Sequence, residues 1–293
     1  MRSAEGLQSI LKDCRGGIDP MIVEKGLLHW LPMWNTIILL SSSVTVHFAH
    51  VGLKNDNRKQ FKGWLLFTVL LAIVFLFGLF QAFVGWWMVK SGLSENPYVS
   101  PYRLTFHLMN ALVIFSMLLW IAMDYRHKIK INFLSKPFTA DFYICISILL
   151  IFITIASGGF MAGTNSGQSF NTFPLMNGKI IPDDYHMEGY GIYNIFANTV
   201  AINFNHRWIS IFSFFFIIFF CFKFIKFNNK NISSKLVYLI IFFLTLQVLL
   251  GVVTLLSNVY LPLASMHQTN SILLLSTLLI SYHQYKLRKV NHE

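Results

Sequence analysis

Three of the ten histidines stand near the start of a long apolar stretch, at positions 107, 206 and 267. An ionisable residue within a membrane helix is a functional candidate, because its burial without a partner is costly. The stretches that begin at His206 and His267 are expected to run in the same direction, so the two imidazoles would lie at similar depth. Two neutral imidazoles on neighbouring helices can bind one haem iron from both sides. The alternative is that each histidine only hydrogen-bonds a neighbouring helix.

Two arginines accompany these histidines. Arg207 directly follows His206 at the predicted water boundary, where its guanidinium could pair with a haem propionate. Arg103 precedes His107 by four residues and therefore shares its helix face. We accordingly predict His107 to be half of a second haem site.

A weak internal repeat indicates where the partner of His107 should be. The pattern Q-x-x-x-G occurs at Gln81–Gly85 and again at Gln247–Gly251, and each copy is followed by an outer turn and a histidine-bearing stretch. His206 lies 41 residues before the second copy, and the position 41 residues before the first copy is Leu40. The repeat therefore predicts a second site that lacks one ligand in register.

Nearby histidines do not fill that position. His47 and His50 lie seven and ten residues beyond Leu40, or about 10–15 Å deeper in a helix, and His29 lies before the stretch. His127, His283 and His292 stand among basic residues and are expected to be solvated. His186 lies in a long polar loop, where a loop contact is the simpler expectation. Walker-type, G-x-S-x-G and H-E-x-x-H motifs are absent from the sequence.

The elements that position these side chains are membrane helices. Apolar residues make up 55% of the chain and charged residues 12%, about half of what a soluble domain carries. Continuous apolar runs of about 20 residues, without alternation, predict helices and exclude barrel strands. The fold class is therefore an all-α polytopic bundle. About seven spans are expected, at roughly 34–53, 64–88, 104–123, 139–161, 205–225, 236–256 and 264–283.

The net charge of +11 is arranged for a membrane, which argues against a nucleic-acid partner. Fifteen of the 23 Lys and Arg residues fall in connections on one side of a seven-span topology. Basic loops mark the cytoplasmic or matrix side. The distribution predicts an inner-membrane protein, bacterial or mitochondrial, with its C-terminus inside and residues 1–33 outside as a tail. The outer loop at 162–204 is too aromatic for disorder and is expected to cap the bundle.

Several motifs together resemble haem A synthase, the enzyme that oxidises a ring methyl of haem O to a formyl group. The resemblance covers the chain from about residue 81 to its end. It rests on Gly85–Leu93, Ser100–Leu108, Asn171–Gly178, Phe204–Arg207, Gln247–Gly251 and His267–Gln268. It implies an eight-helix pseudo-repeat in which His206 and His267 ligate haem b and His107 is a ligand of the substrate haem iron.

The first 80 residues depart from that pattern. The family's first half carries an E-x-x-H-R motif, for which Glu24 and His29 are the nearest replacements, at a different spacing. Residues 19–83 instead resemble cytochrome c oxidase subunit III, through Trp34–His50 and Asn57–Gln60. These resemblances divide the chain into a tail at 1–33, two subunit III-like spans at 34–83, the rest of a first synthase-like half at 84–135, and a second half at 136–293.

The leading hypothesis is a haem A synthase-like oxidoreductase with haem b as cofactor and haem O and haem A as substrate and product. The main alternative is a catalytically impaired, haem b-binding fusion or an oxidase assembly partner. A structural component like subunit III is a third possibility. Membrane lipid is the expected surrounding, haem O synthase or oxidase assembly factors are candidate partners, and a homo-oligomer is compatible with the sequence.

Overall fold

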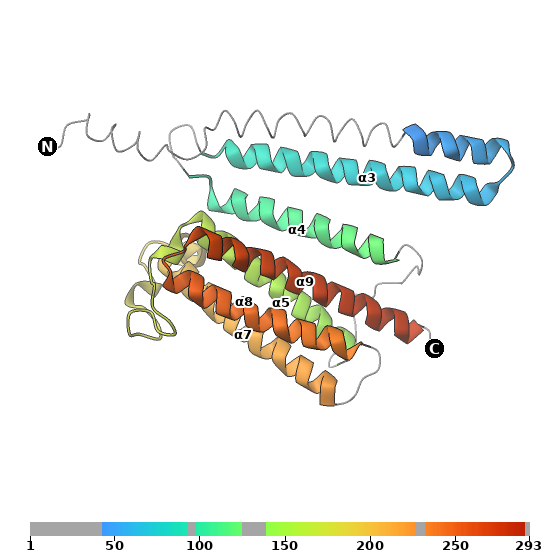
Figure 1. Cartoon of the computed structure of the whole chain (residues 1–293). Coiled ribbons are helices and arrows are strands. Elements are labelled where there is room, and N and C mark those ends of the chain that lie inside the picture. Colours follow the sequence, from blue (N-terminus) through green and yellow to red (C-terminus); the bar gives the residue numbers. More distant parts are fainter. Residues whose placement is uncertain (1–42, 93–97, 125–138, 227–231, 291–293) are drawn as a thin grey trace. The chain divides into compact units, whose positions relative to one another are not determined.

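A computed structural model describes residues 43–92, 98–124, 139–226 and 232–290 (Figure 1). Within these ranges the chain is helical, and its sole β pairing is an isolated bridge between Met176 and Lys179. The predicted all-α class is confirmed. The chain divides into two compact units, residues 1–80 and 81–293, and each is described by itself. Helix α3 (Arg58–Val89) contributes residues to both units.

The first unit contains a helix over residues 43–54 and most of α3. A tight turn joins them, in which Asp56 takes a positive φ of 50° and the Asn57 side chain accepts a hydrogen bond from the Gln60 N–H. The Thr68 hydroxyl donates to that of Thr45 across the pair, at 2.9 Å. Most of the span predicted at 34–53 lies outside the described residues, as do Glu24, His29 and Leu40.

The second unit consists of the end of α3 and five long helices: α4 (Pro101–Asp124), α5 (Ala140–Gly163), α7 (Thr199–Lys226), α8 (Ser234–Leu256) and α9 (Leu261–Val290). Local sequence explains several ends. Proline opens α4, where its missing N–H costs nothing. Thr139 caps α5 by accepting from the Phe142 N–H, and Asn198 accepts from the Val200 N–H at the start of α7.

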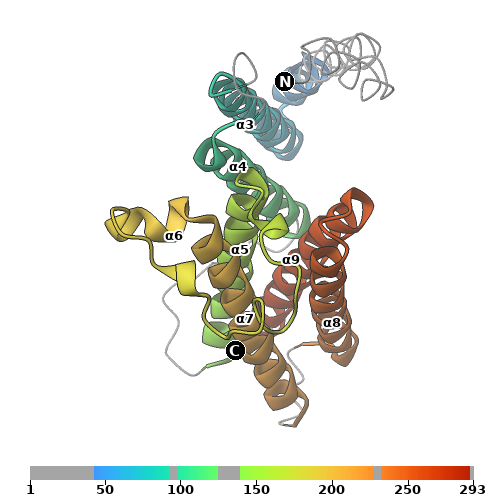
Figure 2. The same ribbon diagram turned by 90° about the vertical axis from the view of Figure 1, so that its left-hand side faces the viewer.

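Four of these helices form a bundle in which α5 neighbours α7 and α9, and α8 neighbours α7 and α9 (Figures 1 and 2). Helix α4 packs against α5 and α9. The core is apolar and lies where α5, α7, α8 and α9 face one another. Its fully buried members include Ile144, Ile217, Ile240, Leu274, Leu275 and Leu278.

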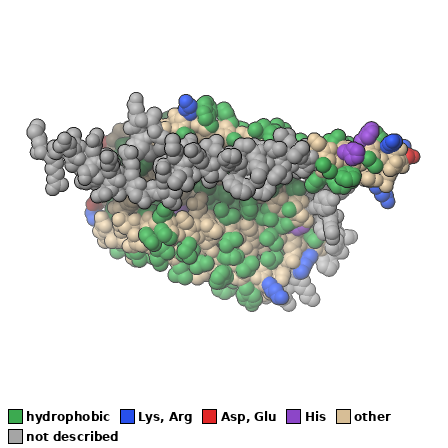
Figure 3. All heavy atoms as spheres, turned by 45° about the horizontal axis from the view of Figure 1, so that its top comes forward, with side chains coloured by type: hydrophobic (Ala, Val, Ile, Leu, Met, Phe, Trp, Pro, Cys, Tyr) green, Lys and Arg blue, Asp and Glu red, His purple; other side chains and the backbone are tan. Residues whose placement is uncertain are grey.

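Five helices in the described ranges are long and apolar enough to cross a membrane: α3, α4, α5, α7 and α8. They match five of the predicted spans, although several are longer, since α3 begins at Arg58 and α7 at Thr199. Apolar side chains cover much of the surface visible in Figure 3, as expected for lipid-facing helices. The span predicted at 264–283 is helix α9, which is richer in Ser, Thr, Asn and His. The protein is a multi-pass helical membrane protein.

One expectation about α9 is wrong. His283 was expected to be solvated, but it is 7% exposed and packs edge-on against Trp120, with ring centroids 5.2 Å apart. Lys286 is also buried, and its ammonium lies 2.9 Å from the Asp141 carboxylate of α5. The C-terminal part of α9 packs against α4 and α5, so the basic character of the sequence there does not indicate exposure.

The long loop between α5 and α7 packs against the bundle, as predicted. It contains short helices η1 (Ser166–Gln168), η2 (Asp183–Tyr185), η3 (Gly191–Tyr193) and α6 (Asn194–Ala197). Buried asparagines hold it together, since the Asn194 amide donates to the Tyr185 carbonyl and the Asn198 amide to the Asp184 carbonyl. The loop is therefore an ordered cap, and it is shorter than expected because α7 starts six residues earlier than the predicted span.

Candidate functional site: two buried histidines in the helical bundle

His206 lies on α7 against α5. Its Nδ1 is 2.8 Å from the hydroxyl of Ser157, and its Cε1 faces Gly158, where a Cβ atom would come within 3.3 Å. The Ser157 hydroxyl also donates to the Thr154 carbonyl, at 2.7 Å. The hydrogen bond engages Nδ1, so Nε2 is the nitrogen available to a ligand.

His267 lies on α9 against α8. The amide nitrogen of Gln247 is 3.3 Å from its Nε2, and a Cβ atom on Gly251 would meet its Cε1 at 2.9 Å. Asn270, one turn along α9, donates to the Gln247 side-chain oxygen at 2.6 Å and to the Phe243 carbonyl at 2.9 Å. Among the described residues the buried Nδ1 of His267 has no hydrogen-bond partner.

His107 repeats the arrangement of His267 at the junction of α3 and α4. The amide nitrogen of Gln81 is 3.2 Å from both ring nitrogens, and a Cβ atom on Gly85 would lie 3.1 Å from Cε1. Asn110, three residues after the histidine, donates to the Gln81 side-chain oxygen at 2.5 Å. The sequence repeat is therefore repeated in the structure: a glutamine, a glycine, a histidine and an asparagine make the same contacts at both places.

His206 and His267 lie on two helices of the same bundle, α7 and α9, both of which pack against α5 and α8. Each ring occupies space left by a glycine on the preceding helix, and each is partly buried. Two imidazoles in one bundle, each lying in a space that a Cβ atom at the facing glycine would fill, form a donor set that fits a haem iron.

Arg207 makes contacts that the sequence did not predict. It is 9% exposed, and its guanidinium donates to the Asn203 side chain and to the carbonyls of Phe170 and Thr172 in the long loop between α5 and α7. These three bonds fasten the cap to α7. A guanidinium has five N–H groups, so two remain for an anionic group such as a propionate.

Arg103 is partly buried and binds back to the end of α3. Its guanidinium donates to the Trp87 carbonyl at 2.8 Å and lies over the indole ring, 4.5 Å from its centroid. The remaining predicted candidate, Glu24, lies outside the described residues, as do His127 and His292. His186 is exposed in the loop, and His47 and His50 are exposed in the first unit.

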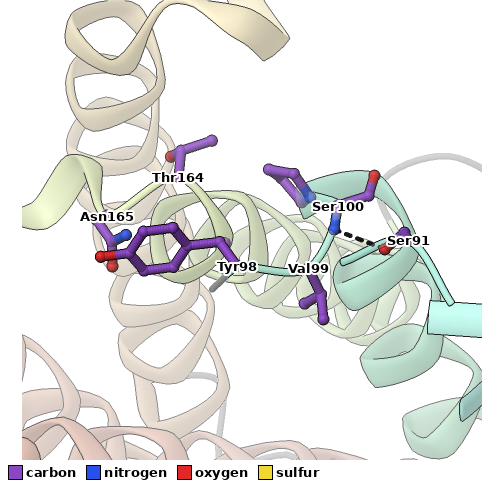
Figure 4. A pocket seen from close by; sticks show the side chains of 8 residues that line it. Ser91, Tyr98, Val99, Ser100, Thr164 and Asn165 are labelled. Atoms are coloured by element: carbon purple, nitrogen blue, oxygen red, sulfur yellow. Dashed lines mark hydrogen bonds between the residues drawn. The ribbon is translucent and has the colours of Figure 1, made fainter. Parts of the chain in front are cut away.

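A pocket of about 390 Å³ opens at the start of α4 (Figure 4). Hydroxyl and amide side chains line it, among them Ser91, Ser100, Thr164 and Asn165, and the Ser100 N–H donates to the Ser91 hydroxyl at 2.8 Å. None of the three histidines or two arginines lines this pocket. We therefore assign no part of the histidine chemistry to it.

Four residues of the site escaped the sequence analysis: Asn110, Asn270, Ser157 and Gly158. The first two carried a usable signal, because H-x-x-N occurs in both halves, at 107–110 and 267–270. Ser157 and Gly158 carried none, since small residues are common throughout membrane helices.

The fold and the repeated histidine arrangement define a class: multi-pass helical membrane proteins with histidines packed between their helices. Comparison with protein families shows which family of that class the chain belongs to. The family described as cytochrome oxidase assembly protein (COX15-CtaA) matches residues 33–279, and the chain belongs to this family.

Relatives in this family carry the name heme A synthase. The chain is 40% identical over 207 residues to heme A synthase of Wolbachia pipientis subsp. Culex pipiens (strain wPip), which covers 71% of this chain and 60% of the relative. It is 37% identical over 213 residues to that of Nitrosomonas eutropha, covering 70% and 58%. The chain thus spans about three-fifths of the length of the relatives it matches. The family match begins at residue 33 and therefore includes the 34–83 segment.

Proposed function

We propose that this chain is a haem A synthase-type oxidoreductase, which oxidises the methyl group of haem O that becomes the formyl group of haem A. The observation that carries the proposal is that His206 and His267 lie on helices of one bundle, α7 and α9, with each ring packed on a glycine of a neighbouring helix. The names and identities of the relatives support the same activity.

In this proposal His206 and His267 hold haem b, and His107 is a ligand of the haem substrate. A haem bound between the first two supplies electron transfer when present. The protein orients the rings through Ser157 and Gln247, and the Arg207-anchored loop excludes water from the outer end of the bundle.

The location follows from the charge distribution and the family. We place the protein in an inner membrane with its C-terminus inside, beside lipid and with oxidase assembly factors or haem O synthase as candidate partners. Nothing in the arrangement calls for nucleic acid, and a homo-oligomer is compatible with it.

The first test measures which haems the chain binds. Protein purified from a host that makes haem O should contain haem b together with haem O or haem A. His206→Ala and His267→Ala should each remove the low-spin haem b absorption, because a bis-histidine iron requires both ligands. A full haem b spectrum in either variant would contradict the assignment of ligands.

One alternative is favoured by a specific observation, the Leu40 that stands where the repeat requires a ligand opposite His107. In that alternative the chain is a fusion with a subunit III-like N-terminal segment, and it binds haem b without synthase activity. The two functions are separated by complementation: a synthase restores haem A to a strain that lacks the enzyme, and the impaired fusion does not. Haem b alone, near one per chain, would also favour the fusion.

A further inference from the structure

We propose that Ser157 and Gln247 are positioning residues that set the tautomers of His206 and His267, so that both neutral rings carry the lone pair on Nε2. The inference rests on the proposed haem site and deepens it. It follows from hydrogen-bond chains that end on backbone carbonyls, which can only accept.

The chain at His206 begins at the Thr154 carbonyl. The Ser157 hydroxyl has a single proton, and it donates that proton to this carbonyl at 2.7 Å. The same hydroxyl oxygen, 2.8 Å from Nδ1 of His206, must therefore accept from the ring. Nδ1 carries the proton, and the lone pair of the neutral ring is on Nε2.

The chain at His267 begins at the Phe243 carbonyl. Because this carbonyl accepts at 2.9 Å, the Asn270 atom that faces it is the amide nitrogen. That nitrogen also lies 2.6 Å from Gln247, so the nearer Gln247 atom is the oxygen. The amide nitrogen of Gln247 is then the atom that faces Nε2 of His267, at 3.3 Å. An amide nitrogen only donates, and Nε2 must therefore be the acceptor.

The first half of the chain orients its glutamine in the same way by a different route. There the Gln81 amide nitrogen donates to the backbone carbonyl of His107 at 3.2 Å, and Asn110 donates to the Gln81 oxygen. In each half, a different backbone carbonyl fixes the orientation of the glutamine, so that its amide nitrogen faces the histidine. At His107 the two ring nitrogens are equidistant from Gln81, so no single tautomer is selected.

The two chains predict unequal roles for the paired histidines. Ser157 binds the nitrogen remote from the lone pair, and this bond can persist when Nε2 binds iron, as is usual for metal-bound histidine. Gln247 donates to the lone pair itself, so this hydrogen bond must break before Nε2 of His267 can bind iron. His206 accordingly keeps its hydrogen bond when haem binds, and His267 loses its hydrogen bond to Gln247.

The test at His206 uses three serine variants in the full-length protein. Ser157→Ala should weaken haem b binding by about 10- to 100-fold, as expected for loss of an outer-shell partner, and Ser157→Thr should restore it. Ser147→Ala is the matched control, since Ser147 is buried on the same helix and donates to the Tyr143 carbonyl. Equal haem affinity in the Ser157→Ala and Ser147→Ala proteins would overturn the role of Ser157.

The test at His267 reads the tautomer directly. In haem-free protein with ¹⁵N-labelled histidine, the Nε2 resonances of His206 and His267 should be of the unprotonated type, assigned by their loss in His206→Gln and His267→Gln. Gln247→Met removes the hydrogen-bond donor. The Nε2-protonated form should then become populated for His267 and not for His206. Gln268→Met, an exposed neighbour, should leave it unchanged. A protonated Nε2 in the unaltered protein, or no change in Gln247→Met, would overturn the inference.

These outcomes are separate from failure of the proposed function. If the unaltered chain binds no haem, the proposed function fails, whatever the tautomers are. If it binds haem b through His206 and His267 but the serine and glutamine variants match their controls, only the present inference fails.

Discussion

At the scale of single residues, the three histidines share a neighbour that has no side chain. Gly85, Gly158 and Gly251 each face the Cε1 atom of a histidine on the next long helix. A glycine inside a helix costs roughly 1 kcal/mol relative to alanine, so its presence at three equivalent places has a local reason. The reason is space: each glycine lets an imidazole lie directly against the neighbouring backbone.

This packing makes a prediction for Gly251→Ala. The new Cβ would lie 2.9 Å from Cε1 of His267, which is too close, and the ring must move by several tenths of an ångström. Haem b binding should therefore weaken by roughly tenfold or more, because ligand geometry is held by packing. The fold should persist, since alanine is the better helix former. Haem titration and thermal unfolding of the same samples measure both effects.

Gly78→Ala is the matched control for that substitution. It makes the same change in α3, at a position where an added Cβ meets nothing within 4 Å. Its haem affinity should equal that of the unaltered protein. If Gly251→Ala behaved like this control, contact with the histidine would not be the reason for the glycine.

At the scale of elements, α9 differs from the other long helices because it buries many polar side chains. Its C-terminal half is enclosed by neighbouring helices, and Ser281, His283 and Lys286 are all buried there. A lysine in such a place requires an opposite charge, and Asp141 in the first turn of α5 supplies it. The pair also suits the helix dipoles, with an anion at the start of α5 and a cation near the end of α9.

Breaking this ion pair should destabilise the bundle. Lys286→Met leaves the Asp141 carboxylate buried without its cation, a change that costs about 3–5 kcal/mol in buried pairs. The double variant with Asp141→Asn should recover much of that loss, because no uncompensated charge remains. Denaturant-induced unfolding in detergent, followed by helical circular dichroism, measures the free energy of unfolding.

Lys179→Met provides the comparison on the surface. It removes an ion pair with Asp183 whose side chains are 56% and 75% exposed, and such pairs contribute at most about 1 kcal/mol. A loss in Lys286→Met no larger than in Lys179→Met would mean that the buried pair does not hold α5 to α9.

At the scale of the whole molecule, the distribution of charge predicts the orientation of the chain in the membrane. Fifteen of the 23 basic residues are predicted on one side, including the three in the last turns of α9. A green fluorescent protein fused to the C-terminus should therefore fluoresce, because it folds in the cytoplasm, and a periplasmic alkaline phosphatase fused there should be inactive. The opposite pair of results would reverse the orientation and place the histidine sites on the inner side.

The sequence alone determined most of the elements and predicted the candidate ligands. Long apolar runs identified the membrane helices, since a helix in lipid needs little beyond length and hydrophobicity. The depth of His107, His206 and His267 within those runs identified the candidate ligands. The Q-x-x-x-G repeat identified two equivalent positions, although it did not reveal what the glutamine and glycine contact.

The tertiary structure decided what depends on neighbours from distant parts of the chain. It packed each histidine against a glycine of another helix. It also placed Ser157 within hydrogen-bond distance of His206, and it linked Asn270 to Gln247 and Gln247 to His267. It also joined Arg207 to the long loop between α5 and α7. It buried His283, which the sequence had placed in solvent. The physical reason is that apolar membrane helices carry little information about which face meets which partner. Burial and hydrogen bonding of a single polar side chain are settled only when the helices pack.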